Sequence, residues 1–186
     1  MQSWEIALIL AAALAVGVVI VWTLYERQRS RRLKNHFGKE YDLTVAEIGD
    51  RRRAESNLRQ REERVSKLAI RPLTESDRQR FQSDWTACQS HFVDDPIDTV
   101  YQADELVREI MRVRGYPAHD VLERFEDISA AYPWLASDYR HAREIVARHR
   151  SGDASTEEMR QAMVHYRKIF SELLEEGRYE KHERAS

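Results

Sequence analysis

The stretch IALILAAALAVGVVIVWTL, from Ile6 to Leu24, decides the architecture of this 186-residue chain. Its 19 residues carry no charge and are almost all apolar. An α-helix of that length extends roughly 28 Å, close to the ~30 Å hydrocarbon core of a bilayer. Because the stretch offers no polar face for water, we expect residues 6–25 to form a transmembrane anchor, preceded by a short extracytoplasmic tail over residues 1–5.

A cleaved signal peptide is the competing interpretation of this stretch. Such a peptide begins with a basic segment, and residues 1–5 contain no basic side chain. Cleavage after an alanine of the triplets between residues 11 and 15 would also leave nine apolar residues, 16–24, on the mature chain. We therefore favour an uncleaved anchor.

The flanks of the anchor predict its orientation. All 30 Lys and Arg residues lie at or beyond Arg27, so the basic cluster follows the apolar stretch. The positive-inside rule then predicts a single-pass membrane protein, with its N-terminus outside and its C-terminal domain in the cytoplasm. A reducing compartment agrees with the single cysteine, Cys88. The residues expected at the membrane interface are Trp4, Trp22, Tyr25, Arg27, Arg29, Arg31, Arg32 and Lys34.

Residues 26–69 predict a long, charged juxtamembrane helix that acts as a stalk. The stretch contains no proline, and its apolar residues form one narrow stripe, with a spacing of three or four positions up to Ile48 and a sparser one beyond it. Gly38 and Gly49 weaken this helix, so a break at either position is expected to be tolerated. We favour a stalk that packs partly on the C-terminal domain, with a coiled-coil homodimer or a solvated spacer as alternatives. The stripe consists of Leu33, Phe37, Tyr41, Val45, Ile48, Leu58, Val65 and Leu68.

The charge is distributed unevenly along the chain. Residues 26–73 carry 14 basic and 8 acidic side chains, whereas residues 74–186 carry 16 basic and 23 acidic ones. An acidic distal region disfavours nucleic acid as a partner. The run from Arg51 to Arg53 is more typical of a solvated helix face, because no aromatic residue interleaves with it.

Residues 70–177 predict a compact bundle of about five helices, followed by a flexible tail over 178–186. No segment alternates with period two for the length of a strand, so the fold class is all-α. Capping residues and apolar faces place the helices at about 74–92, 95–115, 121–132, 135–152 and 155–177. Trp85 and Trp134 are both expected to be largely buried in this domain.

Catalytic and cofactor motifs are not found in the sequence. Six scattered glycines do not form a phosphate loop, and one cysteine excludes a disulfide framework. Cys88 lies on an aromatic-rich helix face, where a core role is more typical than an active thiol. We predict no enzyme activity, no catalytic residue and no cofactor.

Two clusters remain as candidate ligand sites. Asp138, His141 and Glu144 recur every three residues on one helix, and His165 on the next helix is a potential fourth metal ligand. A surface hydrogen-bonded cluster is the more ordinary interpretation of these four residues. The second cluster is an anion site formed by Arg160, His165 and Arg167 near Tyr166, for which a salt-bridged helix edge is the alternative.

The distal region contains a set of recognisable motifs. They are Ile70-Arg71-Pro72-Leu73, Trp85, Phe92-Val93-Asp94-Asp95-Pro96, Ala103-Asp104, Arg114-Gly115-Tyr116-Pro117 and Arg160-Gln161-Ala162-Met163-Val164-His165-Tyr166-Arg167. Together these motifs resemble a family of uncharacterised bacterial single-pass membrane proteins with a helical cytoplasmic domain. The resemblance covers roughly residues 35–175 and implies the same architecture and a bacterial inner membrane, but no catalytic residue or cofactor.

Three functions are compatible with these features. The first is a membrane-anchored interaction or scaffold module whose partners are the lipid bilayer and another protein. The second is a metal or ligand sensor, or an enzyme, with a site between helices. The third is an organiser of the cell envelope or of division that acts through a coiled stalk.

Overall fold

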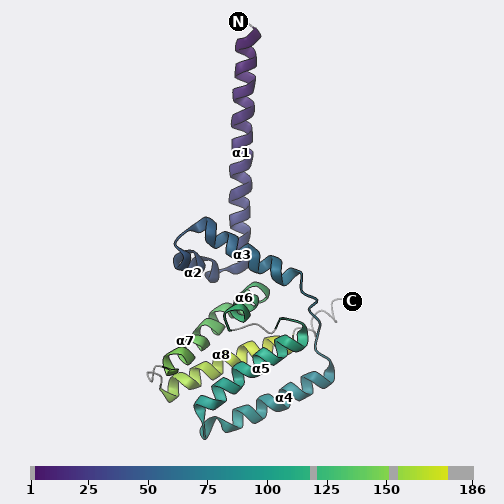
Figure 1. The fold of residues 1–186 in the computed structure, drawn as a ribbon, viewed down its shortest axis with the longest axis vertical. Coiled ribbons are helices and arrows are strands. Elements are labelled where there is room, and N and C mark those ends of the chain that lie inside the picture. Colours follow the sequence, from purple (N-terminus) through teal and green to yellow (C-terminus); the bar gives the residue numbers. More distant parts are fainter. Residues whose placement is uncertain (1–2, 118–120, 151–154, 176–186) are drawn as a thin grey trace. The chain divides into compact units, whose positions relative to one another are not determined.

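The computed structural model describes the backbone of residues 3–117, 121–150 and 155–175, and the side chains in these ranges from Leu14 onward except those of Ala15 and Arg150. Every regular element in these ranges is a helix, which confirms the all-α class (Figure 1). The chain divides into two compact units, unit 1 (Met1–Leu58) and unit 2 (Arg59–Ser186). The boundary predicted from the sequence, between residues 69 and 70, lies within unit 2.

Unit 1 begins with the long helix α1 (Ser3–Phe37), which is followed by α2 (Lys39–Ile48) and by α3 (Arg51–Ser66), whose last turns belong to unit 2. The prediction of one long helix over residues 26–69 is therefore wrong. The chain breaks at both of the weak points that the sequence indicated, because Gly38 and Gly49 adopt φ angles of 54° and 72°. These values lie outside the right-handed helical region, and glycine reaches them at little cost.

The first part of the apolar stripe supplies the interior of unit 1, whereas Val65 and Leu68 at its end pack against the core of unit 2. Leu33 and Phe37 of α1, Tyr41 of α2, and Leu58 of α3 are all buried. Ile48 remains exposed, because α2 ends there. A stripe that looks too thin for a core in one straight helix is thus sufficient when the helix turns back on itself.

Part of the anchor prediction lies outside the described side chains, namely Trp4, residues 6–13 and Ala15. Among the residues that were described, no helix has both the length and the apolar character required to cross a membrane. From Leu14 to Tyr25, the large apolar side chains of α1 are all exposed.

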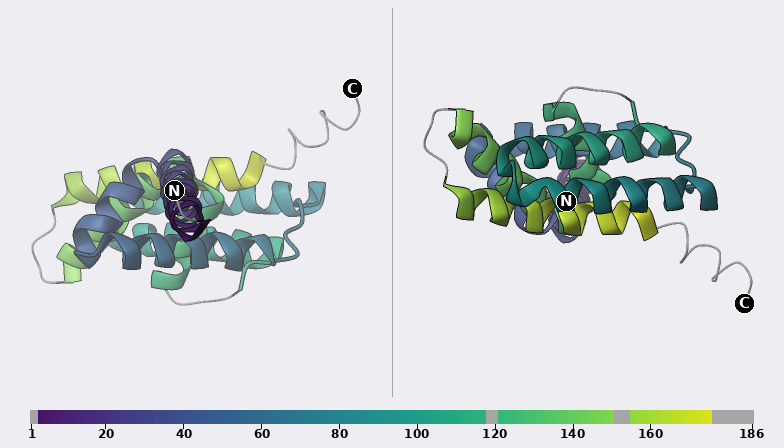
Figure 2. Two further views of the ribbon diagram at one scale, coloured as in Figure 1. Left: turned by 90° about the horizontal axis from the view of Figure 1, so that it is seen from above. Right: turned by 90° about the horizontal axis from the view of Figure 1, so that it is seen from below.

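Unit 2 contains the five helices expected from the sequence, arranged so that the longer ones run along one another (Figures 1 and 2). Three N-caps that the sequence indicates are confirmed: Thr74 forms a reciprocal capping box with Asp77, Ser155 forms one with Glu158, and Asp95 accepts a hydrogen bond from the backbone N–H of Asp98. Two short 3-10 turns, η1 (His91–Val93) and η2 (Pro133–Leu135), separate neighbouring helices. The five helices are α4 (Glu75–Ser90), α5 (Pro96–Arg114), α6 (Val121–Ala131), α7 (Ala136–Arg150) and α8 (Thr156–Glu175).

The core of unit 2 lies between these helices. Trp85 of α4 is 3% exposed, and its ring stacks on Phe170 of α8 with a centroid distance of 4.5 Å. The prediction that Trp134 is also buried is wrong, since 57% of this residue is exposed. It lies in the short turn η2, between the buried side chains of Tyr132, which precedes the turn, and Leu135, which ends it.

Two of the sequence motifs meet at the end of α5. The backbone N–H of Arg71 donates to the carbonyl oxygen of Arg114 at 2.8 Å, and its guanidinium donates to the carbonyl oxygen of Val113 at 2.8 Å. Gly115 ends the helix with φ of 100°, and a Cβ atom there would lie 2.8 Å from the carbonyl oxygen of Ala69. This close approach explains why the motif requires glycine.

Candidate functional site

The predicted metal ligands are only partly brought together. His165 of α8 contacts Asp138 of α7, with 2.9 Å between Nδ1 and Oδ1, and its ring centroid lies 5.4 Å from that of His141. The ammonium group of Lys168 donates a hydrogen bond to the second carboxylate oxygen of Asp138, and Glu144 is exposed. Within the described ranges, no three His, Cys, Asp or Glu side chains converge in a way that could hold a metal ion.

Asp138 instead joins α7 to α8. Burial raises the pKa of its carboxyl group, but the hydrogen bonds from Lys168 and His165 outweigh that effect and hold the pKa below its usual range. The carboxylate is therefore charged at neutral pH and stabilises the contact between the two helices. The geometry matches the alternative that we considered, a hydrogen-bonded cluster near the surface.

Asp104 is the centre of a polar network that the sequence did not indicate. One oxygen of its carboxylate, Oδ2, accepts from Nη2 of Arg124 at 2.9 Å, and its backbone carbonyl accepts from Nη1 at 3.0 Å. The other oxygen, Oδ1, accepts from the hydroxyl groups of Tyr166 at 3.2 Å and Tyr139 at 3.4 Å. These four side chains come from α5, α6, α7 and α8, so a single carboxylate links four helices.

The two tyrosines of this network act as hydrogen-bond donors. Burial raises the pKa of Tyr139 and of Tyr166, and the nearby charge of Asp104 raises both further. Both phenols therefore stay protonated at neutral pH and cannot serve there as general bases. As donors to one carboxylate, they link α7 and α8 to α5.

Cys88 is a core residue, as its aromatic neighbourhood suggested. It is 3% exposed, and its thiol lies 3.4 Å from the carbonyl oxygen of Thr99. Burial, together with the charge of Asp98, raises the pKa of the thiol to about 11. At neutral pH the group is protonated and is a weak nucleophile.

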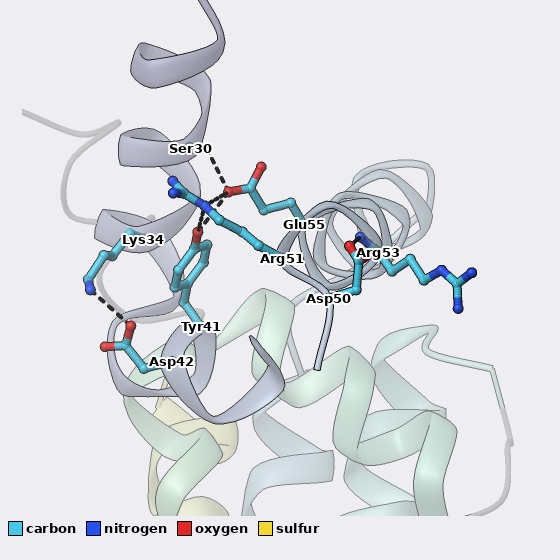
Figure 3. A network of polar contacts seen from close by, with 8 residues as sticks. All are labelled: Ser30, Lys34, Tyr41, Asp42, Asp50, Arg51, Arg53 and Glu55. Atoms are coloured by element: carbon cyan, nitrogen blue, oxygen red, sulfur yellow. Dashed lines mark hydrogen bonds and ion pairs between the residues drawn. The ribbon is translucent and has the colours of Figure 1, made fainter. Parts of the chain in front are cut away.

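A second polar network joins the three helices of unit 1 around Glu55 (Figure 3). One carboxylate oxygen of Glu55 accepts from Ser30 of α1 at 2.6 Å, from Tyr41 of α2 at 2.7 Å and from Arg51 of α3 at 2.9 Å. Asp50 starts α3 by accepting from the backbone N–H of Arg53 at 3.0 Å. The sequence signal for this turn was the Gly49-Asp50 pair, a helix stop followed directly by a capping residue.

The charge of Glu55 predicts a pH-dependent stability for unit 1. Burial raises its pKa, but the donors Ser30, Tyr41 and Arg51 outweigh burial and lower the pKa below its usual value. A carboxyl whose pKa is lower in the folded state stabilises the fold above its unfolded pKa of about 4.3, and this contribution is lost as the pH falls through the folded pKa.

We therefore expect Glu55→Gln to reduce the free energy of unfolding by about 1 to 2 kcal/mol at pH 7 and by less at pH 3. The comparison is made by urea titration followed by far-ultraviolet circular dichroism of the full chain in detergent. Glu144→Gln, at an exposed position of α7, is the matched control. Equal losses at both pH values for Glu55→Gln would show that its charge does not stabilise the fold.

The described part of unit 2 also has an open groove beside α8. Its volume is about 210 Å³, and α8 provides one wall while the end of α4 and the turn η1 provide the other. The groove is lined by Gln89, Phe92, Arg160, Met163, Val164 and Arg167.

The predicted anion site is not assembled in this groove. Arg160 and Arg167 line it, whereas His165 contacts Asp138 and Tyr166 contacts Asp104. The reason is helical periodicity, since residues 160 and 167 are two turns apart on one face while residues 165 and 166 project from other faces. The two arginines are therefore neighbours of an apolar surface and do not surround a single ion.

The predicted interface residues that the structure describes lie on α1. Trp22 and Tyr25 are 58% and 60% exposed, and the basic residues after them are exposed as well. Lys34 forms an ion pair with Asp42 of α2 at 2.9 Å. Lys34 therefore helps to hold α2 against α1.

Comparison of the chain with models of protein families, with curated proteins and with solved structures finds no match. The resemblance of its motifs to a family of single-pass membrane proteins accordingly stays a prediction.

Proposed function

We propose that this protein is a membrane-anchored interaction module, in which α1 holds a helical domain at the cytoplasmic face of a bacterial inner membrane. The observation that carries the proposal is the exposure of α1 between Val18 and Tyr25, where every large apolar side chain is 51–67% exposed. Successive residues of a helix point about 100° apart, so this segment is apolar on all sides.

An apolar helix of this kind is unfavourable in water. Each Å² of apolar surface that is removed from water stabilises the system by roughly 25 cal/mol. Large contiguous apolar patches are uncommon on the surface of soluble monomers. A lipid bilayer would cover all faces of the helix at once. The proposed span comprises residues 6–25, so it also includes the apolar residues before Leu14.

The orientation is supported by the basic cluster that follows the span. Five basic residues occur between Arg27 and Lys34, and positive charges of this kind are retained on the cytoplasmic side. Unit 2 would then be exposed to cytoplasmic proteins. The interaction role is supported by the open groove beside α8, which presents apolar side chains and two arginines to solvent.

Membrane extraction and reporter fusions test the anchor. The full chain should remain in the membrane pellet after washing with alkaline carbonate, whereas a variant lacking residues 1–25 should be released. A reporter fused after Ser186 should be active when it requires the cytoplasm and inactive when it requires the periplasm. Release of the full chain would overturn the anchor, and activity of the periplasmic reporter would overturn the orientation.

The interaction role is tested separately by affinity purification of the full chain from membranes in mild detergent. The expected result is a protein that co-purifies in a fixed molar ratio. A chain that purifies alone as a monomer, or that retains a stoichiometric small ligand, would contradict this role. A mass corresponding to two copies in light scattering would identify a homodimer.

A further inference from the structure

We propose that the groove beside α8 docks an amphipathic helix of a partner protein, one that carries two carboxylates two turns apart on either side of apolar residues. The proposal deepens the interaction role proposed above and names the chemistry of the partner. It depends on the groove of unit 2 and is independent of the membrane anchor.

The arrangement on α8 follows from its sequence. Arg160, Met163, Val164 and Arg167 occupy positions i, i+3, i+4 and i+7, which fall on one face of a helix. Seven residues of helix span about 10.5 Å, so the two arginines lie near the ends of an apolar strip about two turns long. A partner helix with acidic residues at the same spacing would meet both charges in register.

The apolar part of the groove is accessible to a partner. Val164 is 55% exposed, and Phe92 contributes an aromatic wall from η1 while it packs against the core of unit 2. Val93, the next residue, is 88% exposed. Methionine adapts its shape to different apolar partners, and Met163 lies in the floor of the groove.

The two arginines are available for new ion pairs. Arg167 is exposed, and among the residues that the structure describes it makes no hydrogen bond or ion pair. Arg160 contacts Glu157 through Nε and Nη2 at 2.8 and 2.7 Å, but both side chains are more than half exposed. Exposed pairs of this type contribute little to stability, so a partner can replace Glu157 at small cost.

The size of the groove favours side chains over a small molecule. Pockets for drug-sized ligands typically enclose about 300 to 1,000 Å³ and bury most of the ligand, whereas this groove measures about 210 Å³ and is open. In helix-in-groove recognition the apolar face of a partner helix packs into an apolar groove, and Phe92, Met163 and Val164 supply such a lining here.

The test measures binding of defined peptides to the full chain in lipid nanodiscs by fluorescence anisotropy. The probe is a cross-linked helical peptide of about 18 residues, with two glutamates seven positions apart and leucines between them on the same face. A second peptide carries lysines in place of the two glutamates. We expect the glutamate peptide to bind at least about tenfold more tightly than the lysine peptide.

Charge reversal on the protein should exchange this preference. The double variant Arg160→Glu with Arg167→Glu should lose at least about tenfold in affinity for the glutamate peptide and should bind the lysine peptide better than the wild type does. The matched control is Arg108→Glu with Arg112→Glu on α5, which breaks two exposed arginine–glutamate pairs of the same i, i+3 type. This control should leave both affinities unchanged.

The apolar contact is tested by Val164→Asp, which should weaken both peptides. If the double reversal unfolds the chain, as judged by circular dichroism, Arg167→Ala takes its place and should cost about threefold for the glutamate peptide only.

Four results would overturn the proposal: no binding of the glutamate peptide at about 1 mM, equal binding of both peptides, unchanged binding after charge reversal, or self-association of the chain that Val164→Asp abolishes. A co-purified protein together with failed peptide binding would reject the groove and keep the interaction role.

Discussion

Replacing Trp85 with alanine is expected to lower the free energy of unfolding by about 3 to 5 kcal/mol. Trp85 is 3% exposed and stacks on Phe170, so truncation removes both apolar burial and an aromatic contact between α4 and α8. Because the total stability of a domain is roughly 5 to 15 kcal/mol, this change should lower the thermal midpoint strongly. The measurement is thermal unfolding of the full chain in detergent, followed by circular dichroism.

Trp134→Ala is the matched control for this experiment. It removes the same side chain, but from a position that is 57% exposed in the turn η2. We expect a loss below about 1 kcal/mol, as for most surface substitutions away from special backbone features. Equal effects of the two substitutions would mean that Trp85 does not contribute to the core.

Asp104→Ala is expected to cost a similar amount, about 3 to 5 kcal/mol, for an electrostatic reason. The guanidinium of Arg124 is buried, with 5% of the side chain exposed, and would lose its carboxylate partner. The hydroxyl groups of Tyr139 and Tyr166 would lose their common acceptor at the same time. Leaving a buried charge and buried donors without partners is more costly than losing a surface ion pair.

Two further variants make this prediction specific. Asp104→Asn keeps an oxygen acceptor for the tyrosines and should be less destabilising than Asp104→Ala. Asp84→Ala, at an exposed position of α4, should have an effect within about 0.5 kcal/mol of zero. The free energies are compared by urea titration, and a loss under about 1 kcal/mol for Asp104→Ala would show that the network does not hold the four helices together.

Local structure was predictable from the sequence because the contacts that define it lie within a few residues. A capping box at Thr74 and Asp77, an aspartate before Pro96 and a glycine at position 115 mark helix ends wherever they occur. The same reasoning applies to Gly38 and Gly49, which the sequence identified as weak points of the expected stalk. Only the tertiary structure decided that the helix is interrupted at both glycines, and that the helices α1, α2 and α3 on either side of them pack together.

The candidate site was less predictable. Arg160 and Arg167 were recognised as sharing one edge of a helix, but Gln89 and Phe92, which complete the groove, come from a segment about 70 residues earlier in the chain. No local pattern links these two segments. Only the packing of η1 and the end of α4 near α8 makes the strip of α8 into a groove.

The sequence by itself determined the helical class, the N-caps at Thr74 and Asp95, and the apolar character of the first part of α1. Only the tertiary structure decided that Trp85 is buried while Trp134 is exposed. It also decided that the carboxylate of Asp104 accepts hydrogen bonds from three other helices. Asp104 is 20 residues from Arg124 and 62 residues from Tyr166, and Glu55 is 25 residues from Ser30. Capping and periodicity act along one helix, whereas these partners meet only because burial of the apolar faces brings separate helices together.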